Sequence, residues 1–370
     1  MLPLFNILYL ETTRKCNLNC TYCSTGSNGL KDQGEDLPFD TIVNRILKPA
    51  YDLGTRFLDF SGGEFLMRPD AFDLLEYANK TGFVLGIASN GCYINDENLI
   101  RIKKITGNNI LISIGVNSFT SDNFETRDAT IDFILGKIKL LEKYSIRTNI
   151  SITLGQFNKN TFEDTVKKTR ELGVPFNRIP FVPRSCNSNE MMLDKESVKN
   201  YFHPILRKYF NGQISYTPYF LDPEIYFNIS GQRKETHKVP TNPPVGCWVG
   251  AYYAINPEGD VSPCPMFLDH VTGGNAVTED LNKILFESEV FTKIIQRDKL
   301  EGKCGNCKYN FTCGGCRVLA FYRTGNVYAE DPICFIDELS EKEIKQMEKE
   351  TETSFKNYVR MAKFGKIYSK

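Results

Sequence analysis

The chain has 370 residues, of which 41% are hydrophobic and 24% are charged, so it can bury a substantial core and form two or three domains. Forty-five basic and forty-five acidic residues give a formal net charge of zero, which excludes a global field that would attract nucleic acid or an anionic membrane. The start lacks the features of a secretory signal, and no apolar run is long enough to span a bilayer. We therefore expect a cytoplasmic protein that binds neither nucleic acid nor a membrane. Twelve cysteines in such a chain indicate metal binding rather than disulfides.

Three cysteines follow the first predicted strand in a C-x₃-C-x₂-C spacing: Cys16, Cys20 and Cys23. A [4Fe–4S] cluster has four irons, so three thiolates leave one iron open for a substrate or cofactor. The alternative is a zinc knuckle completed by a distant ligand, because zinc prefers four ligands. No histidine lies near these cysteines in the sequence. The spacing therefore favours an iron–sulfur loop.

The first half of the chain alternates strands and helices, which is the pattern of a parallel sheet covered by helices. Strands are predicted near Phe5–Leu10, Arg56–Phe60, Phe83–Ser89, Ile110–Val116, Thr148–Leu154 and Phe176–Val182. Helices are predicted at Phe39–Leu53, Pro69–Asn79, Glu97–Ile105, 128–144 and Thr161–Leu172. Right-handed β–α units curl into an open barrel, and ligands bind at the carboxyl ends of its strands. We predict an α/β fold, a partial (β/α)₆ barrel similar to a TIM barrel, with the cysteine loop at the ligand-binding end.

The stretch ETTRKCNLNCTYC resembles the cluster loop of radical S-adenosylmethionine (radical SAM) enzymes, with Tyr22 at the aromatic position before the third cysteine. The resemblance implies that the amino and carboxylate groups of SAM chelate the fourth iron. It also implies that an electron from the cluster cleaves SAM into methionine and a 5′-deoxyadenosyl radical, which takes a hydrogen atom from the substrate. These enzymes share the partial (β/α)₆ barrel.

Further motifs at strand ends resemble the SAM-binding segments of this family. DFSGGEF, after the second strand, resembles the motif that holds the SAM amino group, although an ordinary strand-to-helix turn is the alternative. ASNGC, after the third strand, resembles the family's Thr-Asn-Gly turn, which would place Asn90 near the adenine of SAM. ISIGVNS resembles the segment that contacts the SAM ribose, although Gly115 departs from the usual pattern. NFETRDATIDF resembles the segment that contacts the SAM carboxylate, although Ala129 departs from the pattern. The alternative for Arg127 in this second segment is an ordinary solvated arginine. The residues that these matches assign to SAM are Tyr22, Gly62, Gly63, Glu64, Asn90, Ser113 and Arg127.

The alternation of strands and helices fails from about Pro183 to Pro244, where prolines, asparagines and aromatic residues accumulate. We expect a helix at Asp194–Tyr209 and an irregular bridge that wraps the open side of the barrel. Arg184 and Cys186 follow the sixth strand without an assigned role. The predicted divisions are a barrel at 1–183, a bridge at 184–244, an auxiliary-cluster domain at 245–336 and a C-terminal amphipathic helix at 337–370.

A second cysteine-rich region contains Cys247, Cys264, Cys304, Cys307, Cys313, Cys316 and Cys334. The C-x₂-C-x₅-C-x₂-C run within it could, by itself, bind structural zinc. The full order, including Gly-x₄-Cys at Gly259, resembles the SPASM extension of radical SAM enzymes. This resemblance implies two auxiliary [4Fe–4S] clusters. One would be held by Cys304, Cys307, Cys313 and Cys334, and the other by Cys247, Cys264, Cys316 and an unknown fourth ligand. Cys92 has no clustered partner, and we expect it to be structural.

The SPASM resemblance implies an enzyme that oxidises a side chain of a ribosomal peptide or protein. It also implies an external electron donor such as flavodoxin or ferredoxin. Because only fifteen residues precede Cys16, we expect a leader peptide to need another protein or an unusual docking surface. The short spacing before Cys316 resembles enzymes that modify tetrapyrrole side chains in haem and haem d1 synthesis, which is the alternative substrate class. Sulfatase-maturing relatives tend to have an acidic residue directly after the cysteine of Gly-x₄-Cys. Because Pro265 stands at this position here, the resemblance argues against formylglycine formation. A non-catalytic metal-binding scaffold is the alternative of another class. The sequence assigns no catalytic side chain.

Overall fold

The computed structural model describes residues 5–27, 35–120, 127–184, 188–210, 247, 249–250, 252–310 and 313–349. The chain forms two compact units, Pro3–Met192 with Ala251–Thr292, and Leu193–Gly250 with Lys293–Lys370. Cys186, most of the predicted bridge at 184–244, and residues 350–370 of the predicted C-terminal helix lie outside the described residues.

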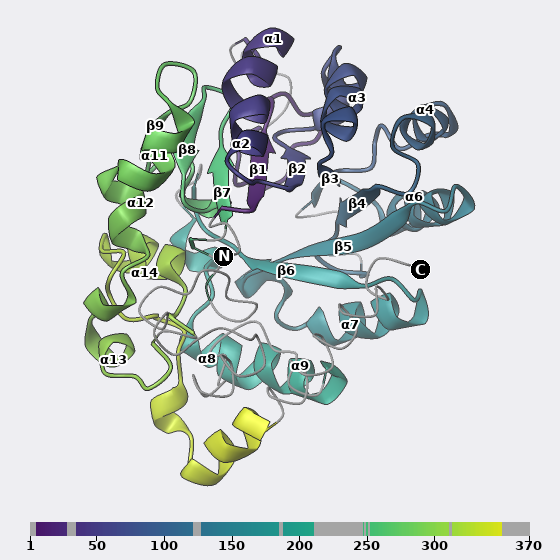
Figure 1. Ribbon diagram of the computed structural model, residues 1–370. Coiled ribbons are helices and arrows are strands. Elements are labelled where there is room, and N and C mark those ends of the chain that lie inside the picture. Colours follow the sequence, from purple (N-terminus) through teal and green to yellow (C-terminus); the bar gives the residue numbers. More distant parts are fainter. Residues whose placement is uncertain are drawn as a thin grey trace. The chain divides into compact units, whose positions relative to one another are not determined.

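A nine-stranded sheet organises the described part of the first unit, in the order β6-β5-β4-β3-β2-β1-β7-β8-β9 (Figure 1). Strands β1 to β6 pair in parallel, so the predicted parallel α/β sheet is confirmed. Their bounds lie within two residues of the predicted ones. The strands are β1 (Ile7–Glu11), β2 (Phe57–Ser61), β3 (Val84–Ser89), β4 (Ile110–Gly115), β5 (Arg147–Leu154), β6 (Phe176–Pro180), β7 (Tyr252–Ile255), β8 (Asp260–Ser262) and β9 (Gly274–Asn275).

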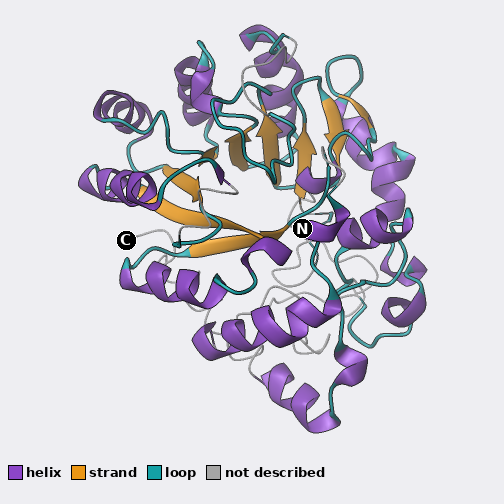
Figure 2. Ribbon diagram, turned by 180° about the vertical axis from the view of Figure 1, so that it is seen from behind, coloured by secondary structure: helices purple, strands orange, loops and turns teal. Residues whose placement is uncertain are grey.

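Helices connect the parallel strands and lie along the outside of the curved sheet (Figures 1 and 2). Their starts follow from local capping: the side chain of Asn95 accepts the backbone N–H of Asn98, and that of Thr130 accepts the N–H of Phe133. The α- and π-helices of this unit are α1 (Phe39–Thr41), the π-helical η1 (Ile42–Leu47), α2 (Lys48–Asp52), α3 (Ala71–Thr81), α4 (Asp96–Thr106), α6 (Ile131–Lys143), α7 (Phe162–Glu171), α11 (Leu281–Glu287) and α12 (Glu289–Ile294), which extends past the unit's last residue. Short 3₁₀ turns are η2 (Phe65–Met67), η3 (Gln156–Asn158), η4 (Asn189–Met191) and η7 (Pro265–Phe267).

Alternation along the strands separates a core face from an inner face. Leu8 and Leu10 of β1, and Leu58 and Phe60 of β2, are almost fully buried. Their neighbours in the chain point to the opposite face of the sheet because successive side chains alternate. That inner face carries polar groups and is only partly buried. The sheet therefore places polar side chains on its inner face.

A hairpin from the cysteine-rich half of the chain extends the barrel sheet. Strand β7 pairs in parallel with β1, and β8 pairs antiparallel with β7. The hydroxyls of Thr55 and Tyr253 lie 2.9 Å apart, and Phe5 packs edge-on against Tyr253. Within the described residues, this hairpin packs with the compact unit that contains the parallel strands, and the predicted division at 245–336 stays a prediction. The hairpin packs there because β7 pairs with the edge of β1, which would otherwise be open.

The second unit is mainly helical in its described part. Asp194 caps the first of its helices by accepting the N–H of Ser197 at 2.7 Å. Tyr309 and Met347 form a small buried cluster, against which Cys307 and Cys313 pack. The helices are α8 (Lys195–Ser197), the π-helical η5 (Val198–Phe202), α9 (His203–Phe210), η8 (Arg297–Lys299), α13 (Gly302–Gly305), α14 (Arg317–Thr324) and η9 (Ile336–Glu338). Residues 341–349 are also helical.

A buried ion-pair network joins three separate segments of the first unit. Arg184, just beyond β6, donates to both carboxylate oxygens of Glu11 at 2.6 and 2.7 Å, and to Asp269 at 2.9 Å. Arg14 donates to Asp269 at 2.8 Å and to Glu258 at 2.7 Å. Glu11 and Arg184 are buried. Because Glu11 ends β1 and Arg14 precedes Cys16, the network fixes the base of the cysteine loop.

We predict that replacing Arg184 with Met lowers the free energy of unfolding by about 3 to 5 kcal/mol, because Glu11 would stay buried without its cation. Anaerobic guanidinium denaturation followed by circular dichroism measures this change. Lys143→Met, which removes an exposed pair with Asp96, is the control and should leave stability nearly unchanged. Adding Glu11→Gln to Arg184→Met should recover part of the loss, and a double variant that is no more stable than Arg184→Met would contradict this explanation.

Candidate functional site

The three N-terminal cysteines lie on the loop that follows β1, at the carboxyl end of the parallel strands. Their thiols are unbridged, and Cys16 is the most buried of them. The amide nitrogen of Asn90 donates to the Cys16 sulfur at 3.5 Å. The Cys23 sulfur lies 3.2 Å from the Thr25 hydroxyl, and the Cys20 thiol donates to the Arg127 carbonyl at 3.0 Å. The fold therefore brings the loop into contact with the ends of other barrel segments.

Burial raises the pKa of the Cys16 thiol, and it raises the pKa of Cys20 to about 12. Thiols bind iron as thiolates, so loading the loop must release these protons. The donor set suits iron–sulfur chemistry, because three cysteines on one loop leave an iron position open. A hydrogen bond from Asn90 to Cys16 would also stabilise the thiolate form.

Gly62 and Gly63 place the β2 loop directly against the backbone of the cysteine loop. The N–H of Gly63 donates to the Thr13 carbonyl at 2.7 Å, and the N–H of Glu64 donates to the Lys15 carbonyl at 2.8 Å. Gly62 has a φ of +130°, and a Cβ at Gly63 would lie 2.1 Å from the Lys15 oxygen. Both glycines are thus required by close backbone approach. Their predicted contact with SAM stays a prediction.

Glu64 is fully buried, and its hydrogen bonds connect the loop after β2 to the end of β3. Its carboxylate accepts the Ser89 hydroxyl at 3.1 Å and the Asn90 N–H at 2.7 Å. Burial raises the pKa of Glu64 to about 7. Asn90 in turn donates to Asn17 at 2.9 Å, so it touches the cysteine loop itself. The predicted roles of Glu64 at the SAM amino group and of Asn90 at the adenine remain predictions.

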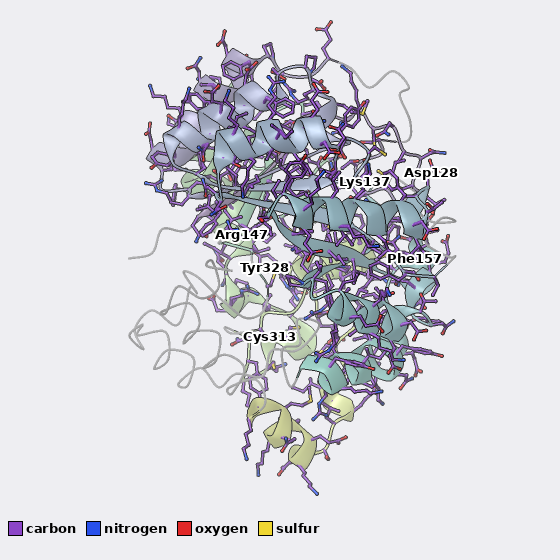
Figure 3. The ribbon with its side chains drawn as sticks, turned by 90° about the vertical axis from the view of Figure 1, so that its right-hand side faces the viewer. Asp128, Lys137, Arg147, Phe157, Cys313 and Tyr328 are labelled. Atoms are coloured by element: carbon purple, nitrogen blue, oxygen red, sulfur yellow. The ribbon has the colours of Figure 1, made fainter. Side chains whose placement is uncertain are left out.

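Arg127 lies across the end of β4 and reaches back to the cysteine loop. It donates to the Tyr22 hydroxyl at 2.5 Å, and a Cβ at Gly115 would lie 2.3 Å from its guanidinium. The departure from the family pattern at Gly115 therefore makes room for Arg127. Tyr22 also stacks on Phe157, with 5.7 Å between ring centroids. Figure 3 labels Phe157, and also Asp128, which follows Arg127 in the chain.

Ser113 lies on β4 between Ala88 of β3 and Asn149 of β5. Both Ser113 and Asn149 alternate with the buried residues of their strands, which places them on the inner face. The buried side-chain oxygen of Asn149 has no hydrogen-bond partner in the described residues. The position of Ser113 is compatible with its predicted ribose contact.

An acid–tyrosine cluster, which no sequence motif had predicted, lies on the inner face of the sheet. The Asp59 carboxylate accepts a hydrogen bond from Tyr252 and lies over Gly86, where a Cβ would be 1.8 Å from its oxygen. Tyr9 and Ser61 share a 2.5 Å hydrogen bond beside it. Burial raises the pKa of Asp59 to about 6. The signal was available in FLDFS, where an acidic residue interrupts an apolar strand.

In the second unit, four cysteines surround one pocket, which is also lined by Gly314, Gly315 and Asp331. The four are Cys304, Cys307, Cys313 and Cys334. Backbone N–H groups point at three of their sulfurs: Asp331 to Cys304 at 3.3 Å, Tyr309 to Cys307 at 3.5 Å, and Gly315 to Cys313 at 3.4 Å. Such N–H···S bonds stabilise thiolates and iron–sulfur clusters. The residues present therefore fit the predicted auxiliary cluster.

The other predicted auxiliary ligands come from both compact units. Cys247 donates its N–H to the Cys313 carbonyl at 3.0 Å, and Cys316 donates its N–H to Asp331 at 2.7 Å. Cys264 follows β8 in the first unit. This ligand set remains a prediction. Within the described residues, no three Cys, His, Asp or Glu side chains converge closely enough for a single metal ion.

Comparison with known proteins agrees with this geometry. Residues 10–169 match the family model of the Radical SAM superfamily, and residues 247–308 match that of SPASM, an iron–sulfur cluster-binding domain. The AdoMet-dependent heme synthase of Methanosarcina barkeri (strain Fusaro / DSM 804) is 30% identical over 338 residues, covering 88% of this chain and 94% of that protein. The chain belongs to the radical SAM superfamily.

Two further similarities extend over most of this radical SAM chain. The PqqA peptide cyclase of Gluconobacter oxydans (strain 621H) is 22% identical, covering 88% of this chain and 89% of that protein. The crystal structure of Streptococcus suis SuiB bound to precursor peptide SuiA has a TM-score of 0.67 at 16% identity, covering 90% of this chain and 76% of that chain. At this identity, the structural likeness supports the fold alone.

The predicted class is thus confirmed: the protein is a radical SAM enzyme with a SPASM domain, and its cofactors are SAM and [4Fe–4S] clusters. The comparisons support an enzyme rather than a non-catalytic scaffold. Among the helices that the structure describes, none has the length and apolar character needed to cross a membrane.

We predict that Gly63→Ala removes the iron of the N-terminal cluster and leaves the auxiliary iron in place, because the added methyl would collide with the Lys15 carbonyl. Iron analysis and electron paramagnetic resonance after anaerobic reconstitution measure this loss. Gly136→Ala on α6 is the control, since a Cβ there meets no atom within 4 Å. Full loading of the N-terminal cluster in Gly63→Ala would show that the close approach is dispensable.

We predict that Asp59→Asn stabilises the protein more at high pH than at low pH. The raised pKa of about 6 means that the folded protein holds a proton more tightly than the unfolded chain, so ionised Asp59 costs stability as the pH rises through this value. The gain in unfolding free energy should be about 1 to 2 kcal/mol larger at pH 8 than at pH 5. Denaturant titrations at both pH values measure it. Asp96→Asn is the control, because hydrogen bonding to Lys143 lowers the pKa of Asp96, and an equal gain in both variants would contradict the prediction.

Proposed function

We propose that this radical SAM enzyme oxidises a side chain of a ribosomal peptide or protein, which it binds on the inner face of the barrel. The observation that carries the proposal is the Asp59–Tyr252 pair on that face. A partly buried carboxylate and a hydroxyl can accept and donate hydrogen bonds to a peptide, or pair with a cationic side chain. The bound SAM supplies the 5′-deoxyadenosyl radical that takes the substrate hydrogen atom.

The state of the nearby arginines supports a peptide over a substrate with many carboxylates. Arg14 is bound to Glu258 and Asp269, Arg68 is bound to Asp70, and Arg184 is bound to Glu11. Each of these three cations at the cluster end of the barrel is therefore already neutralised by an acidic side chain. Releasing one would leave its partner carboxylate unpaired, which is costly for a buried pair.

The electron required for SAM cleavage comes, in this proposal, from a flavodoxin or ferredoxin in the cytoplasm. The cysteines of the described residues are all unbridged, which suits a reducing compartment. Removal of a hydrogen atom, a second electron and a proton from the substrate completes a two-electron oxidation. The auxiliary-cluster ligands of the second unit lie in a sulfur-rich pocket suited to receiving that second electron.

A tetrapyrrole is the second candidate substrate, and sequence similarity favours it. The heme synthase of Methanosarcina barkeri, at 30% identity, is more similar than the peptide cyclase, at 22%. The short C-x₂-C spacing that ends at Cys316 points the same way. A haem precursor carries several carboxylates, so this substrate would need cations other than the three paired arginines.

We predict that the reconstituted enzyme, with dithionite and SAM, forms 5′-deoxyadenosine and removes two hydrogen atoms from a peptide encoded beside its gene. Mass spectrometry of the peptide and chromatography of deoxyadenosine measure both products. The control variant replaces Cys16, Cys20 and Cys23 with Ala and should form neither. Modification of an iron porphyrin with propionate side chains, and of no peptide, would support the second candidate instead. Absence of SAM cleavage in the fully loaded wild type would overturn both.

A further inference from the structure

Two arginines are buried among the cysteines of the second unit. Arg297 is 2% exposed and Arg317 is 0% exposed. Arg297 begins η8, and Arg317 begins α14 directly after Cys316. Removing a guanidinium from water costs several kcal/mol unless a counter-charge or hydrogen bonds compensate. The partners of these two side chains therefore indicate what the site is built to hold.

Arg297 is incompletely satisfied. Its Nη2 donates to the Cys247 carbonyl at 3.0 Å, whereas its Nε and Nη1 have no hydrogen-bond partner in the described residues. No acidic side chain pairs with it within the same described part. The titratable groups that act on its charge are Cys247 and Cys313, with Arg317 opposing them. A cation in this position faces sulfur ligands rather than carboxylates.

Arg317 is directed at the pocket of the first auxiliary set. Its Nη1 donates to the carbonyls of Val327 and Ala329 at 2.8 and 2.7 Å, and its Nη2 lies 3.9 Å from the Cys304 sulfur. Its Nε has no partner in the described residues. Asp331 interacts electrostatically with Arg317. The hydrogen bonds of its carboxylate, however, come from the N–H groups of Cys316 and Ile333.

The glycine pair between Cys313 and Cys316 admits both guanidiniums. A Cβ at Gly314 would lie 1.3 Å from Nη1 of Arg297, and a Cβ at Gly315 would lie 2.7 Å from Nη2 of Arg317. Both glycines have positive φ angles, +69° and +60°. The C-G-G-C sequence is therefore explained by two cations that lie against the backbone between two ligands. Two independent features, the unpartnered N–H groups and the glycines, point to the same place.

We propose that Arg297 and Arg317 are positioning residues that supply counter-charge to the auxiliary iron–sulfur clusters and raise their reduction potentials. A [4Fe–4S] cluster with four thiolates carries a net negative charge that grows when the cluster is reduced, so a fixed cation beside it favours reduction. The unpartnered N–H groups would donate to cluster sulfur. This inference rests on the proposed function, in which these clusters accept an electron from the substrate radical.

The test is a redox titration, monitored by electron paramagnetic resonance, of the auxiliary clusters in the full chain. The background replaces Cys16, Cys20 and Cys23 with Ala, so that only auxiliary clusters are observed and no SAM cleavage or substrate is needed. Arg317→Met and Arg297→Met should each shift a potential to lower values at unchanged iron content. Arg317→Lys, which keeps the charge, should shift it less. Arg323→Met, on the exposed side of α14, is the control and should cause no shift.

A second measurement, of the melting temperature, tests the proposal even if a variant incorporates little iron. In the iron-free protein, Arg297→Met removes a buried cation without a counter-charge and should raise the melting temperature. In the loaded protein, the same substitution removes a partner of the cluster and should lower it. Unchanged potentials at full loading, the same sign of melting shift in both states, or zinc in place of iron at these cysteines would overturn the proposal. Because none of these readouts uses SAM or substrate, failure of the proposed peptide chemistry would be seen separately.

Discussion

The buried pair of Arg184 and Glu11 is the constraint on which the first unit depends. Glu11 is the last residue of β1, so its carboxylate fixes where the cysteine loop begins. Through Asp269, the same guanidinium holds the segment that follows the β8 hairpin. A bidentate buried pair tolerates little displacement, since its energy depends on geometry that compensates desolvation. The N-terminal loop, the end of β6 and the hairpin are thereby held in one arrangement.

On this base, the proposed SAM site is shaped mainly by backbone. Gly62 and Gly63 lie against the cysteine loop, and Gly115 leaves space for the guanidinium of Arg127. Glu64 and Asn90 connect the ends of β2 and β3 to that loop by hydrogen bonds. Residues that the family resemblance assigns to SAM thus have structural partners of their own. The loop is pre-organised because each of these contacts restricts it independently, which reduces the ordering needed when cofactors bind.

The two units treat buried charge in different ways. In the first unit, Arg184 finds carboxylates among residues far away in the sequence. In the second, the described residues that accept hydrogen bonds from Arg297 and Arg317 are carbonyl and sulfur groups, while the nearby Asp331 accepts the N–H groups of Cys316 and Ile333. Charge that is neutralised within the protein serves rigidity, whereas charge left without a protein partner is available to a bound anionic group. This contrast separates a scaffold that holds the radical-generating loop from a pocket suited to electron transfer.

The sequence alone determined the cysteine spacings, the strand positions and the family, because these features depend on local periodicity and on ligand geometry that short motifs record. It also indicated that Gly62 and Gly63 matter, but not that they pack on Thr13 and Lys15. Only the tertiary structure showed β7 beside β1, Asp59 beside Tyr252, and the partners of Arg184. Such contacts join residues that are distant in the chain, and no local pattern encodes which strand edge or which carboxylate a segment will meet. Pairing across the fold is decided by burial and charge neutralisation in three dimensions, which become defined only when the strands have assembled into the sheet.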